Sequence, residues 1–400
     1  MAMETKGISK LDLKRRNRKQ ILLAIRRAGM LARVDIAAKL SLTRAAVTII
    51  TNQMIAQNIL EDLNSPLPAA ADEPKKKGRR KTMIRINPTY RYILGAVIEE
   101  DHVCIGLSNL ALEPVAQECL PLTDSTDLDE IVSFIVTASK RLVKKASLNA
   151  KQVLGLGVGI VPSRWEQMRA EKDEDEQVHF SKLCYLLEME LSLPVCAANA
   201  ISLYAMANIG YGADACAEQL LLYGGANFHF ATVADYALVG GIFANTALVD
   251  RIILCPGGEK AKGFPEGSVH AEMATPIVLK RMKKETGKEW TVDEANQAYT
   301  DGNEKIVAIM NEQLRKLATL IYNLCIGHRT SKVVLQKFRI NDAQRAYLAQ
   351  YFETLSPDPS ELKIVYSPID GDREFLAGCS LAAEKQFFEL GGLQPSEKMM

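Results

Sequence analysis

The first 89 residues contain no tryptophan, phenylalanine or tyrosine, and no part of the chain approaches 18 uninterrupted apolar residues. The lack of a long apolar run excludes a membrane-spanning helix. The lack of aromatic residues argues against a surface-bound helix, which needs bulky apolar groups opposite its cations. Residues 1–20 are polar and basic, without the apolar centre of a secretory signal. The sequence therefore predicts a cytoplasmic protein with no membrane partner.

The eight cysteines are scattered, and none of them forms a C-x-x-C pair. Reduced thiols in a cytoplasm are the simplest interpretation of this pattern. The chain has 400 residues, of which 48% are hydrophobic and 24% are charged. This is more than one hydrophobic core usually supports, so we expect two or three domains.

The formal net charge of +1 conceals two oppositely charged parts. Residues 1–90 carry 19 Lys and Arg against 7 Asp and Glu, about +12, whereas the remainder carries 30 against 41, about −11. Six of the seven positions from Lys75 to Lys81 are cations. A run of this kind can be a solvated linker. A whole segment of this sign, however, attracts a polyanion and gains free energy from counterion release, which favours nucleic acid as its partner.

Residues 11–28 predict an amphipathic basic helix that ends at Gly29. Two apolar stripes at helical spacing follow it: Ile36, Ala37 and Leu40, then Val47, Ile50 and Met54. Small Ala37 lets two helices cross closely, Ser41 suits a tight turn, and the Thr43 hydroxyl can cap the second helix. This spacing is typical of a helix-turn-helix motif. An ordinary three-helix bundle with a polar face is the alternative.

On the helix-turn-helix interpretation, side chains of the second helix and its first cap meet DNA bases or phosphates. They are Thr43, Arg44, Ala45, Thr48, Asn52 and Gln53. After Asn58, the segments ILEDL and TMIRIN predict two short strands, which would form a wing. We expect the cations between these strands to bind the DNA backbone rather than read sequence. They are Lys75, Lys76, Lys77, Arg79, Arg80 and Lys81.

The chain beyond Tyr92 alternates strands and helices, which predicts an α/β architecture. Strand-like runs precede a helix over 127–148 and a buried strand over 153–161. A second unit starts near residue 193, and it contains a hairpin-like stretch, a long helix, two strands and a final helix over 372–390. Because both units open with strands followed by helices, we expect two related lobes about a cleft.

The order of the segments NRKQILLAIRRAG, GRRKTMIRIN, YILGAVIEEDHVCIGLSNLALEPV, LGLGVGIV and LPVCAANAISLYA resembles transcriptional regulators of the ROK family (repressors, open reading frames and sugar kinases). The resemblance implies an N-terminal winged helix-turn-helix followed by a two-lobed actin-like (RNase H-like) sugar-kinase fold, assembled as dimers or tetramers. The implied domains are a DNA-binding domain at 1–87, a first lobe at 88–195 with helix 372–390 packed back on it, and a second lobe at 196–371.

The resemblance also shows where this chain departs from the kinases of the family at their phosphate sites. Val97 stands at the position of their first-strand aspartate, and the following residues Glu99–Asp101 would repel phosphate. The glycine-rich phosphate turn of the second lobe corresponds to GGANFHFATV. Phe228 and Phe230 stand there where small residues would be needed.

The catalytic and sugar-binding positions implied by the family are altered in the same way. The catalytic aspartate is replaced by Ala200, so the general base that would deprotonate a sugar hydroxyl is missing. Asn199 before it can hydrogen-bond a ligand but cannot take that proton. Thr246 and Val249 stand in place of the glutamate and histidine that contact the sugar.

The zinc cluster of the family is reduced here to Cys255, with His270 further along the chain. We therefore expect no metal, no cofactor and no catalytic residues. The sequence predicts a DNA-binding transcriptional regulator that binds double-stranded DNA as a homodimer or tetramer. We expect it to be a repressor. Two alternatives stay open: a sugar kinase with substituted residues, and a repressor that senses a carbohydrate-related effector through partners such as Asn199.

Overall fold

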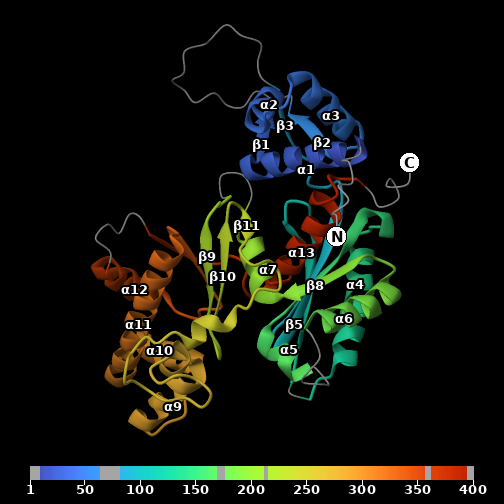
Figure 1. Ribbon diagram of the computed structural model, residues 1–400. Helices are drawn as coiled ribbons and strands as arrows, with labels where there is room; N and C mark the ends of the chain where they lie inside the picture. Colours follow the sequence, from blue (N-terminus) through green and yellow to red (C-terminus); the bar gives the residue numbers. More distant parts are fainter. Residues whose placement is uncertain are drawn as a thin grey trace, which may run out of the picture.

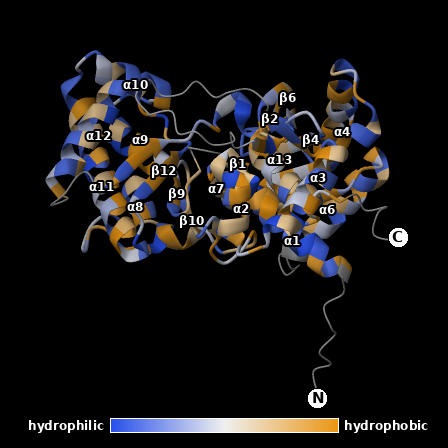
Figure 2. Ribbon diagram, turned by 90° about the horizontal axis from the view of Figure 1, so that it is seen from above, coloured by the Kyte–Doolittle hydropathy of each residue, from blue (hydrophilic) through white to orange (hydrophobic). Residues whose placement is uncertain are grey.

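The computed structural model describes residues 10–63, 82–123, 125–168, 176–210, 215–355 and 362–393. An N-terminal domain lies above two α/β lobes (Figure 1). In the view from above, this domain lies over α7 (Ala200–Ala207) and α13 (Phe375–Ala383), while the helices of the second lobe extend to one side (Figure 2). Within the described residues, no helix combines the length and apolarity needed to cross a membrane.

The N-terminal domain is built from three helices and a small sheet. The helices are α1 (Lys10–Ala28), α2 (Arg33–Leu40) and α3 (Arg44–Ala56). Strands β1 (Met30–Ala32), β2 (Leu60–Leu63) and β3 (Met83–Ile86) pair antiparallel in the order β1-β3-β2. The predicted apolar stripes meet in the core, where Ile36, Val47 and Met54 are fully buried. The three helices and the wing strands agree with the prediction, whereas β1 was not expected.

The first lobe contains a five-stranded sheet in the order β6-β5-β4-β7-β8. Its strands are β4 (Tyr92–Ile98), β5 (His102–Asn109), β6 (Pro114–Pro121), β7 (Val153–Ile160) and β8 (Val195–Asn199). The first three form an antiparallel meander, and β7 and β8 are parallel to β4. Since β8 begins at Val195, this sheet continues past the expected division at residue 195.

Helices cover both faces of the first sheet. One face packs against α4 (Leu128–Lys145), α5 (Pro162–Met168) and α6 (Glu176–Leu191), and the other against α7 and α13. The alternation of side chains along each strand supplies two cores: for example, Leu94 and Ala96 face α4, whereas Ile93 and Val97 face α13. A short 3-10 turn, η1 (Ala150–Gln152), leads into β7.

The second lobe repeats the strand topology of the first. Its strands are β9 (Gln219–Tyr223), β10 (His229–Ala234), β11 (Ala237–Leu238), β12 (Lys332–Gln336) and β13 (Lys363–Tyr366), in the order β11-β10-β9-β12-β13. Its helices are α8 (Val269–Met273), α9 (Thr275–Thr286), α10 (Val292–Thr300), α11 (Glu304–His328) and α12 (Asp342–Leu355), with the 3-10 turn η3 (Ala247–Arg251). The shared topology confirms the expectation of two related lobes.

Helix α13 lies unusually close to the first sheet because the strands beneath it carry glycine. A Cβ on Gly157 would lie 2.0 Å from the carbonyl oxygen of Gly378, and one on Gly95 would lie 2.2 Å from that of Phe375. A 3-10 turn, η5 (Gly371–Arg373), precedes the helix and a π turn, η6 (Glu384–Phe388), follows it. Gly157 of the LGLGVGIV segment and Gly95 of β4 therefore serve helix packing.

Candidate nucleic-acid interface and inter-lobe cleft

The turn between α2 and α3 has the geometry of a helix-turn-helix. Ser41 adopts the left-handed conformation (φ 54°, ψ 37°), and the N–H of Leu42 donates to the carbonyl of Ala37 at 3.0 Å. The Thr43 hydroxyl accepts the N–H of Ala46 at 3.2 Å and so caps α3. Ser41 and Thr43 thus play the structural parts that the sequence predicted for them.

The outward face of α3 carries the side chains predicted to meet DNA. Arg44, Ala45, Thr48, Asn52 and Gln53 are all exposed, as is the cap Thr43. The opposite face is buried in the domain core. The helix therefore presents a row of donors and acceptors of the size that a major groove admits. Their contacts with particular bases stay a prediction.

Ile49 on the same face is a residue that the sequence reasoning missed. Its side chain is 60% exposed although it is large and apolar. An apolar side chain on a recognition helix can contact the methyl group of thymine, which distinguishes thymine from cytosine. The signal in the sequence was its place immediately after Thr48, outside the stripe formed by Val47, Ile50 and Met54.

Arg33, at the start of α2, is a second residue that the sequence reasoning missed. Its side chain contacts both α3 and the wing. Its guanidinium donates to the Thr51 hydroxyl at 3.0 Å and to the side-chain oxygen of Asn52 at 3.2 Å, and it lies 3.2 Å from Asp62 of β2. Arg33 therefore ties α2, α3 and the wing together and fixes the position of Asn52 before any DNA binds.

The wing strands β2 and β3 pair from Leu60 opposite Ile86 to Leu63 opposite Met83. The cationic run Lys75–Lys81 belongs to the segment that connects them, and it lies outside the described residues. Its binding to the DNA backbone therefore stays a prediction.

The N-terminal domain is docked on the body through α1. Arg18 is buried and donates to the carbonyl of Gly391 at 2.7 Å and to the side-chain oxygen of Gln57 at 2.9 Å. Arg15 donates to the carbonyl of Glu389 at 2.9 Å, and the guanidinium of Arg27 stacks 4.1 Å from the ring centre of Tyr236 in the second lobe. Helix α1 thus touches both the C-terminal segment and the second lobe.

The position implied for the catalytic base is closed within the protein. Ala200 is fully buried at the first turn of α7. The Asn199 side chain accepts the N–H of Ile201 at 2.9 Å and donates to the Thr246 hydroxyl at 3.3 Å. Nδ1 of His229 lies 3.2 Å from the same hydroxyl, and burial lowers the pKa of His229 to about 4. The imidazole is therefore neutral near neutral pH, and both ends of the Asn199 amide are used internally.

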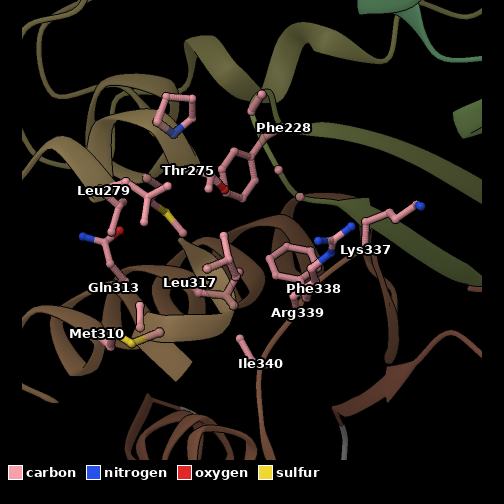
Figure 3. Close-up of a pocket in the computed structure, with 18 of the residues that line it drawn as sticks. Phe228, Thr275, Leu279, Met310, Gln313, Leu317, Lys337, Phe338, Arg339 and Ile340 are labelled. Atoms are coloured by element: carbon pink, nitrogen blue, oxygen red, sulfur yellow. The ribbon is translucent and has the colours of Figure 1, made fainter. Parts of the chain in front are cut away.

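The former phosphate turn of the second lobe is covered by aromatic rings. Phe228 and Phe338 pack edge to face with centroids 6.0 Å apart, and a Cβ on Gly224 would lie 2.6 Å from the Phe338 ring. These rings border a cavity of about 490 Å³ in the second lobe (Figure 3). Close approach of a phosphate group to the backbone N–H groups of this turn is therefore hindered.

The acidic turn between β4 and β5 is engaged in a buried network. The hydroxyl groups of Tyr204 and Tyr223 both donate to the Glu99 carboxylate, the second at 2.8 Å. Burial raises the pKa of Glu99, although the charge of Lys337 opposes this effect. Glu99 thus joins the first lobe to α7 and β9.

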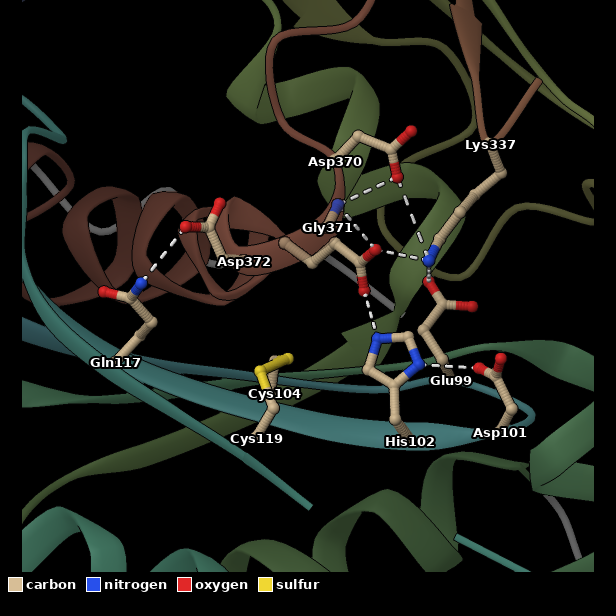
Figure 4. The surroundings of a disulfide bond; sticks show 11 residues. Glu99, Asp101, His102, Cys104, Gln117, Cys119, Lys337, Asp370, Gly371 and Asp372 are labelled. Atoms are coloured by element: carbon tan, nitrogen blue, oxygen red, sulfur yellow. Dashed lines mark hydrogen bonds and ion pairs between the residues drawn. A yellow bond between two sulfur atoms is a disulfide. The ribbon is translucent and has the colours of Figure 1, made fainter. Parts of the chain in front are cut away.

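Lys337 and His102 connect the two lobes through Glu374 at the start of α13 (Figure 4). Lys337 pairs with Glu374 and lies 3.9 Å from both Glu99 and Asp370, while His102 Nε2 lies 2.8 Å from Glu374. The Glu374 hydrogen bond raises the pKa of His102. Burial alone would raise the pKa of Glu374, but His102 and Lys337 outweigh it and lower this pKa. A fixed ion network therefore occupies the space between the lobes.

Cys104 and Cys119 form a disulfide next to this network (Figure 4). They are directly opposite each other on β5 and β6, with Cα atoms 4.2 Å apart. The prediction that all thiols are reduced is therefore wrong for this pair, because strand register, which sequence spacing does not reveal, brings the two sulfurs together. The other six cysteines are free thiols.

His270 lies in the region that corresponds to the zinc loop of the family, and its ring contacts Phe264 and Asp250. The His270 ring stacks on Phe264 at 3.7 Å, and its Nδ1 lies 3.4 Å from Asp250. Across the described part of the chain, no three His, Cys, Asp or Glu side chains are grouped so that they could hold a metal ion. The prediction that the protein binds no zinc awaits metal analysis.

This architecture was compared with known protein families, sequences and solved structures. No protein-family model matches the chain. A xylose repressor of Caldicellulosiruptor bescii is 23% identical over 409 aligned positions, covering 92% of this chain and 95% of the repressor. The crystal structure of a ROK-family transcriptional regulator, a homologue of the E. coli MLC protein, matches with a TM-score of 0.73 at 17% identity, covering 95% of this chain and 98% of that one.

The chain has the fold and domain order of a ROK-family regulator. A ROK hexokinase of Thermus thermophilus also matches, with a TM-score of 0.60 at 14% identity. This match covers 98% of the hexokinase but 74% of this chain. The kinase thus corresponds to part of the chain, whereas the regulator corresponds to nearly all of it. The predicted combination of a winged helix-turn-helix with a two-lobed, actin-like fold is therefore confirmed.

Proposed function

We propose that this protein is a DNA-binding transcriptional repressor whose ROK body serves assembly and sensing rather than phosphoryl transfer. The observation that carries the proposal is the row of exposed side chains on α3, which includes Arg44, Thr48 and Asn52. The helix is capped by Thr43, and its domain is docked on the body through Arg18. The likeness to a repressor over nearly the full length of both chains supports it.

The described residues at the positions that correspond to the kinase site argue against sugar phosphorylation. A positioned base must accept the proton of the sugar hydroxyl, and N–H groups or cations must surround the transferred phosphoryl group. Ala200 cannot act as a base, and Phe338 covers the turn that corresponds to the phosphate turn of the kinases. Lys337, which lines the same cavity as this turn, is paired with Glu374. Loss of a general base alone typically lowers the rate by roughly 10²–10⁴-fold.

A repressor that senses a sugar is the second candidate, favoured by the likeness to a protein named xylose repressor. The internal hydrogen bonds of Asn199 argue against a ready-made hexose site at the former base position. Isothermal titration with xylose, glucose and amino sugars tests this candidate. Saturable heat that is lost in Asn199→Ala would support it.

The main proposal is tested by a coupled ADP-release assay over a panel of hexoses and amino sugars, run beside selection of DNA from a random duplex library. We expect no sugar-dependent ADP release and enrichment of a defined DNA sequence. Sugar-dependent turnover above background would restore the kinase interpretation.

A further inference from the structure

The cavity beside the former phosphate turn has no part in the function proposed above. It has a volume of about 490 Å³, within the range of small-molecule sites. Helices α9, α10 and α11 and the two loops that follow β9 and β12 form most of its walls (Figure 3). Met273 of α8, Gln344 of α12 and the turn Glu99–Asp101 of the first lobe also line it.

The lining of the cavity is predominantly apolar. The side chains that face it include Phe228, Leu279, Met282, Met310, Leu317 and Phe338. Methionine side chains adapt to ligands of different shape. Polar lining groups are mostly committed elsewhere: the side-chain amide of Gln313 donates to the carbonyl of Glu272 at 3.1 Å and accepts from Arg281. A sugar would therefore find few hydrogen-bond partners.

The charges near the cavity disfavour a nucleotide or any other polyanion. Lys337 points away from the apolar side chains and pairs with Glu374 (Figure 3). Glu100 accepts a hydrogen bond from Ser163 at 2.6 Å, and Asp101 lies beside it at the edge. Arg339 lies 3.9 Å from Asp101, so the two carboxylates are only partly balanced. An anionic group would meet net negative charge here.

We propose that this cavity is a binding site for an uncharged, predominantly apolar small molecule. Burial of apolar ligand surface against methionine, leucine and phenylalanine side chains supplies the free energy of binding. The Thr275 hydroxyl is a polar lining group that can orient the ligand. The substituted phosphate turn is then one wall of a new site.

The cavity can report its occupancy to the DNA-binding domain, an extension that rests on the proposed function. Its lining comes from both lobes, because Glu99–Asp101 belongs to the first and the remainder to the second. Helix α1 contacts the second lobe through Arg27 and Tyr236, and the C-terminal segment through Arg18. A ligand that changes the relative orientation of the two lobes would thus change the position of α1 and of the DNA-binding domain.

The test uses the full-length protein and the uncharged fluorescent probe N-phenyl-1-naphthylamine. We expect saturable binding of one probe per chain, with no displacement by ATP, glucose or xylose. Met310→Trp and Leu279→Trp fill the cavity from two different helices, and each should weaken binding at least tenfold. Ile326→Trp is the matched control, because Ile326 lies on the same helix as Met310 but is 60% exposed.

Three results would overturn the proposal: no saturable binding, displacement of the probe by ATP, or unchanged binding in both filled variants when their melting temperatures show that they are folded. Fluorescence anisotropy with the selected DNA separates this proposal from the proposed function. Probe binding without DNA selection removes the repressor function and leaves the site, whereas DNA selection without probe binding removes the site.

Discussion

Arg44 is exposed at the first turn of α3, where its guanidinium can form two hydrogen bonds with guanine in a major groove. Arg44→Ala should lower affinity for the selected DNA by about 1–3 kcal/mol and affect random DNA far less. Lys39→Ala on α2 is the control, because it removes an exposed cation outside the recognition helix. Fluorescence anisotropy checks both variants. An equal loss on selected and random DNA would remove Arg44 from base reading.

His102 gives the inter-lobe network a pH dependence. Its pKa is raised above 6.5 by the hydrogen bond to Glu374. The stability that the charged imidazole contributes is thus fully present below pH 6.5 and is lost as the pH rises through the raised pKa. The neighbouring groups Asp101 and Lys337 keep their charges over this range, since their pKa values are lowered and raised respectively.

His102→Gln should therefore lower the melting temperature more at pH 6 than at pH 9, because only the wild type carries the titrating charge. Differential scanning calorimetry at the two pH values measures the difference. A loss that is the same at both values would mean that His102 contributes packing and neutral hydrogen bonds alone.

Individual residues could be predicted from the sequence where their role is local. Thr43 as a helix cap and Ser41 in a left-handed turn follow from the spacing of the apolar stripes around them. The network of Glu99, Lys337 and Glu374 could not be predicted, because it joins positions far apart in the chain that meet only after both lobes have folded.

At the scale of elements, α13 depends on backbone contact with the first sheet. Gly157→Ala would place a methyl group 2.0 Å from the carbonyl oxygen of Gly378. Because neither backbone can move away easily, the variant should be destabilised by at least about 1–3 kcal/mol, the usual cost of overpacking. Urea unfolding monitored by circular dichroism measures this loss.

Gly327→Ala in α11 is the control for this prediction, since nothing lies within 4 Å of a Cβ built there. It should be neutral or stabilise the helix by up to about 1 kcal/mol. If Gly157→Ala were as stable as the wild type, the close packing of α13 would not limit stability.

Helices α1 and α3 were predictable because their apolar period is strong, and β7 was predictable because it is a short, continuously apolar run. Strand β1 was missed because three residues after a helix carry almost no periodic signal. The disulfide between β5 and β6 was missed for a related reason: the pairing register depends on the turn geometry between the strands.

At the scale of the whole molecule, the proposed repressor function predicts a homodimer, because two recognition helices are needed to bind two half-sites. Helix α6 exposes the large apolar side chains of Tyr185, Leu186 and Met189, and Tyr185 lines a shallow pocket together with Phe243 of the second lobe. A second copy of the chain can cover this apolar surface. Tyr185→Asp combined with Met189→Asp should convert a dimer to a monomer and weaken DNA binding. Ile326→Asp, which changes an equally exposed residue on α11, should do neither.

Sedimentation velocity at micromolar concentration gives the mass of each variant. A wild type that is monomeric both alone and on DNA would contradict the dimer, and a dimeric Tyr185→Asp, Met189→Asp variant would place the interface elsewhere.

The central claim, that the N-terminal domain of this protein recognises a DNA sequence, is tested most directly by selection from a random duplex library with the purified full-length protein. The account predicts an inverted repeat whose half-sites lie one helical turn, about 10 base pairs, or a multiple of it apart. It also predicts that an Arg44→Ala, Asn52→Ala variant fails to enrich the same sequence. No enriched sequence, or the same sequence enriched by that variant, would contradict the account.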